Sequence, residues 1–201
     1  MVDHSTSRRT LLAGTLGGSA LGGLMLGPAG AAGAVEGVTV PSDPAASFFL
    51  AVDGIPGESI DDRFPNTIDV LDWSWGVVNT ISPTHTGGGA GKSRPQPFVF
   101  VAHTSVASPK LFLACAKGTH IKSATLSARK VQATKPFLTV KLENLFVTSY
   151  HVAPGPVDAL PLDVVQLEYG AVTVTYTLQN PDGGVGKSVS AGFDFLHNKV
   201  T

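Results

Sequence analysis

The sequence contains little cysteine and little charge. Its single cysteine, Cys115, excludes a disulfide within the chain. Charged residues make up 14% of the chain, and the formal net charge is −1. A nucleic-acid partner is therefore not expected, because it would require a clustered basic surface. Arg129-Lys130 is the only adjacent basic pair beyond the N-terminal segment, and we interpret it as a solvated strand end.

The chain also lacks an apolar run long enough to span a membrane. A span needs about 20 continuous apolar residues, and the segment Leu11–Leu26 is shorter and diluted by glycine. It follows Arg8 and Arg9 and precedes small-residue cleavage sites, an order typical of a twin-arginine export signal. We predict that residues 1–34 are this signal, cleaved after Ala31 or Ala34, and that the protein is secreted or periplasmic. A membrane anchor and a disordered tail are the alternatives.

One helix stands out in a sequence otherwise typical of strands. Residues 108–118 begin with Ser108 as a candidate N-cap and Pro109 at the first helical position, and they end at Gly118. Leu111, Ala114 and Cys115 share one face of this helix, so Cys115 is expected to pack as a small hydrophobe rather than to act as a reactive thiol.

The remaining chain is predicted to be a single mainly β domain. Residues 35–47 are read as an extended linker and residues 48–199 as a small antiparallel β-barrel, with the short helix packed on its outside. Residues 180–184 are typical of a hairpin turn.

Alternation predicts which side chains face inward. Leu71, Trp73, Trp75 and Val77 are expected on one face of a strand. Apolar residues on both faces of residues 98–101 predict a strand covered on both sides.

Two further strands show the same alternation. Leu138, Val140 and Leu142 alternate with polar residues, which predicts a half-buried strand. Inward parity changes at Gly170, where we expect a bulge with one extra residue.

No pattern of catalytic, cofactor-binding or metal-binding residues is found. Gly91-Lys92-Ser93 suggests a phosphate loop, but Thr86 stands where glycine is required and prolines follow where a helix should begin. The histidines lack metal-ligand spacing, although His85 and His103 could converge in space. We therefore expect neither an enzyme nor a cofactor.

Acidic and aromatic residues leave two further alternatives. Asp61, Asp62, Asp69 and Asp72 are interpreted as solvated charges rather than as a calcium or glycosidase site. Trp73 with Trp75 is interpreted as core packing rather than as a sugar-binding platform.

Several motifs, in order, resemble one known family. They are carried by residues 48–59, 68–77, 87–92, 108–129, 161–176 and 192–194. Together they resemble the haemolysin-coregulated proteins (Hcp) of type VI secretion over residues 47–199. The resemblance implies a non-enzymatic subunit that forms a homo-hexameric ring, stacks into a tube and holds small effector proteins in its lumen.

The resemblance also assigns a role to one loop and leaves one question open. It implies that the loop Gly87, Gly88, Gly89, Ala90, Gly91 and Lys92 reaches toward a neighbouring ring. An export signal is not needed for loading into a contractile sheath. The alternative to a tube subunit is therefore a stand-alone exported binding domain with the same fold.

Overall fold

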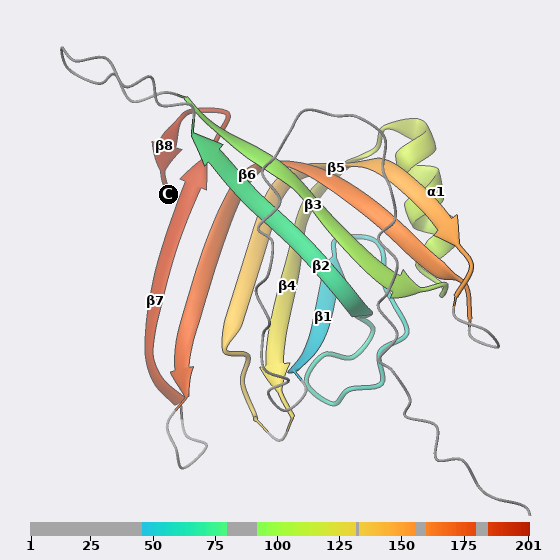
Figure 1. The fold of residues 1–201 in the computed structure, drawn as a ribbon, viewed down its shortest axis with the longest axis horizontal. Helices are drawn as coiled ribbons and strands as arrows, with labels where there is room; N and C mark the ends of the chain where they lie inside the picture. The colour runs from blue at the N-terminus through green and yellow to red at the C-terminus, as the bar shows by residue number, and fades with distance from the viewer. Residues whose placement is uncertain (1–45, 80–91, 132, 156–159, 180–184) are drawn as a thin grey trace, which may run out of the picture. The chain divides into compact units, whose positions relative to one another are not determined.

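A computed structural model describes residues 46–79, 92–131, 133–155, 160–179 and 185–201. They form eight strands and one helix (Figure 1). The elements are β1 (Ala46–Val52), β2 (Ile68–Asn79), β3 (Ser93–His103), α1 (Ser108–Lys117), β4 (His120–Lys130), β5 (Leu138–Ala153), β6 (Leu162–Gln179), β7 (Val185–Asp194) and β8 (Lys199–Val200). The first strand begins at Ala46, two residues before the predicted start. Most of the predicted linker and the turn at residues 180–184 lie outside the described residues.

Six of these strands close into a ring, which confirms the predicted barrel. Their order is β3-β2-β1-β4-β5-β6, all neighbours are antiparallel, and pairing of β3 with β6 closes the ring. Closure removes the sheet edges that would otherwise be left with unpaired backbone groups. The strands β7 and β8 continue from the far half of β6, beyond the closed ring.

In β5 and β6, the alternation of inward-facing residues changes parity part-way along the strand. In β5 the residues of the main core are Leu142 and then Leu145, and in β6 they are Tyr169 and then Val172. The predicted switch near Gly170 is confirmed, but the expected bulge there is wrong, because β5 and β6 keep one register across this point. Opposite Gly170 in that register, Asn144 adopts a left-handed φ of 54°, which reverses the facing of side chains without an added residue.

Gly170 lies in close contact with neighbouring side chains rather than at a bulge. A Cβ atom at this position would lie 2.7 Å from Cδ1 of Leu196 and 3.3 Å from Cβ of Asn144. A larger residue would therefore require the exposed side chain of Leu196 to move.

A bulge is found in β2 instead. The pairing of β2 with β3 shifts between Val70 and Asp72, so Val70 is buried while Leu71 is 49% exposed. The prediction that Leu71 shares a face with Trp73 is therefore wrong, because the extra residue reverses the facing of side chains between them.

The strand β3 is buried on one face only. Phe98 and Phe100 are fully buried, whereas Val99 and Val101 on the other face are partly exposed. The expectation of cover on both faces is therefore not met within the described residues.

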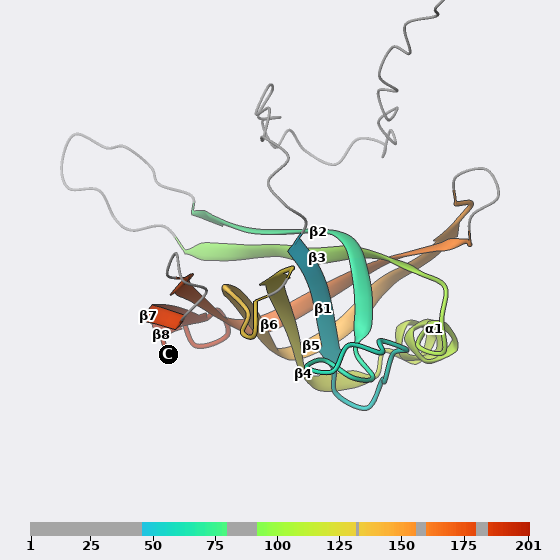
Figure 2. The same ribbon diagram turned by 90° about the horizontal axis from the view of Figure 1, so that it is seen from below.

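The helix α1 lies beside the ring of strands, next to β5 (Figure 2). Leu111 and Ala114 are buried in the main core, and Cys115 packs against it, as predicted from their spacing. Gly118 ends the helix at φ 60° and donates its N–H to the carbonyl of Cys115. The predicted N-cap is wrong: the cap position is Ala107, and Ser108 is already the first helical residue.

Candidate functional site

The residues predicted to carry function lie largely outside the described residues. Arg8, Arg9 and the loop residues 87–91 are not described, whereas Lys92 is exposed immediately before β3. Ser93 begins a strand, so the helix that a phosphate loop must open does not follow Lys92. His85 is also outside the described residues, so the alternative in which it converges with His103 stays open. In the part of the chain that is described, no three metal-ligating side chains come together.

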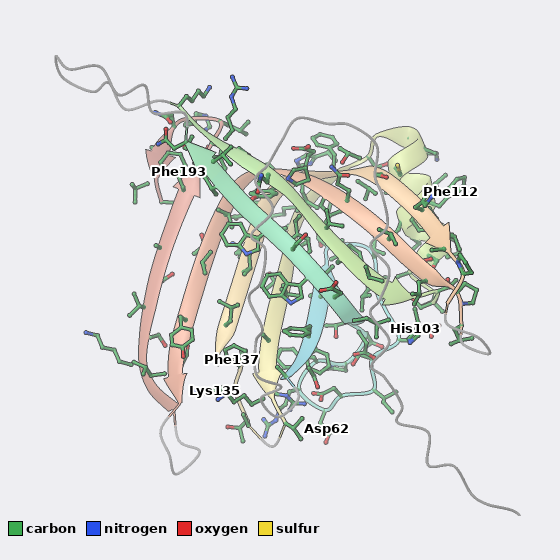
Figure 3. All side chains as sticks on the ribbon, in the orientation of Figure 1. Asp62, His103, Phe112, Lys135, Phe137 and Phe193 are labelled. Carbon is green, nitrogen blue, oxygen red and sulfur yellow. The ribbon has the colours of Figure 1, made fainter. Side chains whose placement is uncertain are left out.

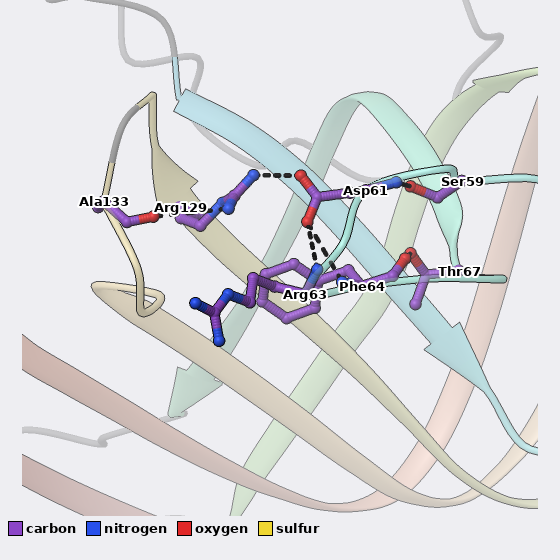
Figure 4. Close-up of polar contacts among 7 residues, drawn as sticks. All are labelled: Ser59, Asp61, Arg63, Phe64, Thr67, Arg129 and Ala133. Carbon is purple, nitrogen blue, oxygen red and sulfur yellow. Dashed lines mark hydrogen bonds and ion pairs between the residues drawn. The ribbon is translucent and has the colours of Figure 1, made fainter.

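One of the predicted solvated charges is part of a compact cluster (Figure 4). Asp61 forms an ion pair with Arg129 and accepts a hydrogen bond from the N–H of Arg63 at 2.9 Å. The Arg129 guanidinium also lies over the rings of Phe49 and Phe64, at 5.5 and 5.8 Å from their centroids. Because both charged side chains are less than 20% exposed, the predictions that Asp61 is a solvated charge and that Arg129 is a solvated strand end are both wrong. The cluster fastens the loop between β1 and β2 onto the outer face of the barrel.

The two tryptophans pack toward the barrel interior, as predicted. Trp73 stacks on Phe98, with 6.3 Å between ring centroids, and contacts Phe48 edge-on. Trp75 packs against the same core but is only partly buried. It lies where the strands β2 and β3 diverge from the closed ring, at the edge of an apolar opening.

This opening is a groove between the far ends of β2 and β3 and the ribbon of β6 and β7. Its cavity volume is about 430 Å³, and it is lined by Trp75, Val77, Val172, Val174 and Phe193 among others. The inward face of the ribbon continues past the groove, because Tyr176 pairs directly with Val189 two positions further along. Tyr176 is 50% exposed and Val189 is 59% exposed. We call Trp75, Val77, Tyr176, Val189 and Phe193 the groove surface.

A second apolar surface lies beside α1. Phe112 on the helix is 57% exposed and contacts the ring of Tyr150 edge-on at 6.1 Å. Val152 on β5 is 54% exposed and lies two residues beyond Tyr150 on the same strand. We call Phe112, Tyr150 and Val152 the helix surface. Figure 3 shows Phe112 and Phe193 on opposite sides of the domain, so the two surfaces lie at different places on the molecule.

Two backbone edges accompany these surfaces. The first edge belongs to β2, which pairs with β1 only as far as Val70. The second belongs to β7, which pairs with β8 only at Phe193 and Asp194. Within the described residues, the rest of each edge has no strand partner. Exposed strand edges and exposed apolar surfaces both favour association with another chain.

A buried polar cluster, which was not predicted from the sequence, underlies the helix surface. Asp163 on β6 is only 2% exposed. Its carboxylate accepts hydrogen bonds from Ser108, from Tyr150 at 3.0 Å and from Thr104 at 3.1 Å. Burial raises the pKa of Tyr150, and the hydrogen bond to Asp163 and its charge add to this effect. The sequence signal was an aspartate at an inward position of an otherwise apolar strand.

No helix among the described residues is long and apolar enough to cross a membrane.

Comparison with known protein sequences relates the chain to one family. A family model described as type VI secretion system effector, Hcp, matches residues 49–176. The protein Hcp1 of Pseudomonas aeruginosa is 31% identical over 158 residues, which cover 77% of this chain and 98% of that protein.

Solved structures show the same relationship. One described as a type six secretion system protein has a TM-score of 0.73 at 25% identity and covers 78% of this chain and 100% of its own. Hcp1 from Salmonella typhimurium has a TM-score of 0.67 at 33% identity and covers 78% of this chain and 99% of its own.

Proposed function

Because the chain belongs to the Hcp family of type VI secretion proteins, we propose that it assembles with copies of itself into closed, hexameric rings. Its role is structural: rings stack into a tube, and the lumen carries small effector proteins. A closed ring requires a heterologous interface, in which one surface of each subunit meets a different surface of the next.

The observation that carries this proposal is the presence of two exposed apolar surfaces that lie at different places on the molecule. The groove surface includes Tyr176 and Val189, and the helix surface includes Phe112 and Val152. Apolar side chains on both surfaces would be removed from water if the helix surface of one copy packed on the groove surface of the next. The stretch of β7 that has no strand partner among the described residues lies beside the groove surface and offers further backbone hydrogen bonds to the same neighbour.

The interface can be tested with two neighbouring residues on opposite faces of β7. Val189 shares the face of Phe193, whereas Ser188 lies on the other face and bonds the hydroxyl of Thr177 at 2.9 Å. We expect Val189→Lys to shift the protein from rings to monomers in size-exclusion chromatography with light scattering, because it places a charge in an apolar contact. Ser188→Lys is the control and should retain rings. Rings of parental mass in Val189→Lys would refute this interface.

The N-terminal segment supports a proposal about export. Arg8 and Arg9 precede a weakly apolar stretch and small-residue cleavage sites, so we propose that the twin-arginine pathway exports the folded protein. Replacing both arginines with lysine should leave the precursor inside the cell, as measured by immunoblotting of cell fractions. Unchanged export of that variant would refute the proposal.

The loop Gly87–Lys92 is proposed to contribute to ring stacking. It joins the far ends of β2 and β3, and Lys92, its one described residue, is exposed. A glycine-rich loop adds little to a packed core, because ordering each residue costs about 1–2 kcal/mol of conformational entropy. Contact with a neighbouring ring would offset that cost.

A further inference from the structure

The buried carboxylate of Asp163 joins three separate elements of the fold. Its hydrogen-bond donors are Thr104 in the loop after β3, Ser108 at the start of α1 and Tyr150 on β5. Asp163 itself belongs to β6. One side chain on β6 therefore connects the helix to β5, the strand beside it.

Burying this carboxylate costs free energy, which its interactions in the fold must offset. A carboxylate removed from water is unfavourable unless it is paired or well hydrogen-bonded. The ion pairs found among the described residues do not include Asp163, so its stabilisation there comes from neutral hydroxyl groups.

One such interaction is found at the start of α1. The cap position, Ala107, makes no side-chain cap hydrogen bond, and the first turn contains no acidic residue. Ser108 accepts the N–H of Ser105 at 2.8 Å and donates its hydroxyl proton to Asp163. An anion at a helix N-terminus is stabilised by the helix dipole. Asp163 thus supplies from β6 the negative charge that the helix does not carry itself.

We infer that Asp163 is a positioning residue that holds α1 and Tyr150 in the arrangement required by the helix surface. The inference rests on the proposed ring assembly. Through Ser108 the carboxylate fixes the start of the helix that carries Phe112, and through its bond to Tyr150 it fixes the ring that Phe112 contacts. Loss of the carboxylate releases both halves of this contact, while the barrel core stays in place.

The test compares Asp163→Asn with a core variant of similar stability. Val140→Ala removes buried apolar volume from β5, and Val140 belongs to neither the polar cluster nor the helix surface. At equal unfolding free energy, we expect Asp163→Asn to weaken ring assembly by about tenfold more than Val140→Ala does. The purified chain is used at several concentrations, with mass measured by light scattering. A purely structural role predicts equal losses for the two variants and would overturn the inference.

Hydrogen exchange gives a second readout that does not depend on assembly. In Asp163→Asn, amides of residues 108–117 should exchange at least about tenfold faster, whereas those of β4 should change little. If Asp163→Asn does not fold, Tyr150→Phe and Ser108→Ala carry the same comparison. A parent that is monomeric refutes the ring proposal, and the exchange of α1 then decides the anchoring role alone. Unchanged exchange in α1 overturns the inference in every case.

Discussion

At the scale of single residues, the hydroxyl groups of two tyrosines differ in their hydrogen bonding. Tyr150 donates its hydroxyl to the carboxylate of Asp163 at 3.0 Å. Tyr169 is only 6% exposed, and its hydroxyl has no hydrogen-bond partner among the described residues. A hydrogen bond to a charged group contributes about 1.5–3 kcal/mol, whereas a buried polar group without a partner is a cost.

We therefore predict opposite effects of the same substitution. Tyr150→Phe should lower the free energy of unfolding by about 1.5–3 kcal/mol, because it removes a donor to a buried carboxylate. Tyr169→Phe should change it by less than about 0.5 kcal/mol or raise it. Denaturant unfolding of the two purified variants measures the difference. A Tyr169→Phe variant as unstable as Tyr150→Phe would contradict this account of the two hydroxyl groups.

Ionisation of Tyr169 should contribute to the pH dependence of stability. Burial, with a smaller effect of the Glu168 charge, raises its pKa to about 12, whereas a tyrosine in the unfolded chain titrates near 10. The folded state therefore holds this proton more tightly. Its contribution to stability is complete below about pH 10 and is lost as the pH rises toward 12. Between these values the unfolding free energy of the parent should fall more steeply than that of Tyr169→Phe, and equal slopes would contradict the prediction.

At the scale of elements, α1 was predictable because several local signals agree. Pro109, Gly118 and the spacing of Leu111 and Ala114 all specify the same helix. Its cap was not predictable, because the acceptor that Ser108 reaches is Asp163, which lies 55 residues further along the chain.

Bulges were harder to predict than strands for a similar reason. Alternation identified the inward faces of β5 and of both halves of β6. It placed Leu71 wrongly, since a bulge depends on the partner strand and not on the local pattern. At Gly170 the pattern gave the position of the parity change, but Asn144 on the neighbouring strand determines its mechanism.

The helix should behave as an element of stability, and its two leucines offer a matched comparison. Leu111 is 1% exposed and Leu113 is 47% exposed. Leu111→Ala should lower the free energy of unfolding by about 2–5 kcal/mol, because it leaves a cavity in the core. Leu113→Ala should cost less than about 1 kcal/mol, since most surface substitutions have small effects. Similar losses in denaturant unfolding would mean that α1 does not bury the face described.

The loop Gly87–Lys92 should affect stacking without affecting the fold. Shortening it to two residues should leave the melting temperature nearly unchanged, because surface loops tolerate changes of length. Stacks of rings seen by electron microscopy should become fewer or shorter. A shortened protein that unfolds, or that stacks as well as the parent, would refute the proposed role.

At the scale of the whole molecule, the closed barrel and the family followed from the sequence, but the surfaces did not. Motifs spread over residues 47–199 indicated the Hcp fold, and the solved structures share it. The groove surface and the helix surface depend on where strands diverge and where α1 packs. Residues such as Val189 and Phe112 look in sequence like any other apolar residue of a strand or a helix.

The groove surface and the helix surface both leave apolar side chains exposed, and the proposed self-assembly would cover both. Tyr176 and Val189 on one side, and Phe112 and Val152 on the other, are each about half exposed or more. A monomeric binding domain with the same fold would have to keep these side chains in water or give them to an unrelated partner. In the proposed ring, another copy of the same chain would cover each of them.

The mass of the purified protein from Val35 onward tests this account most directly. Size-exclusion chromatography with multi-angle light scattering gives that mass without reference to shape. We predict a single species with the mass of six chains at high protein concentration. On dilution this ring either stays intact or dissociates into chains that remain folded. A species with the mass of one chain at every concentration would contradict the account and would favour the stand-alone exported domain.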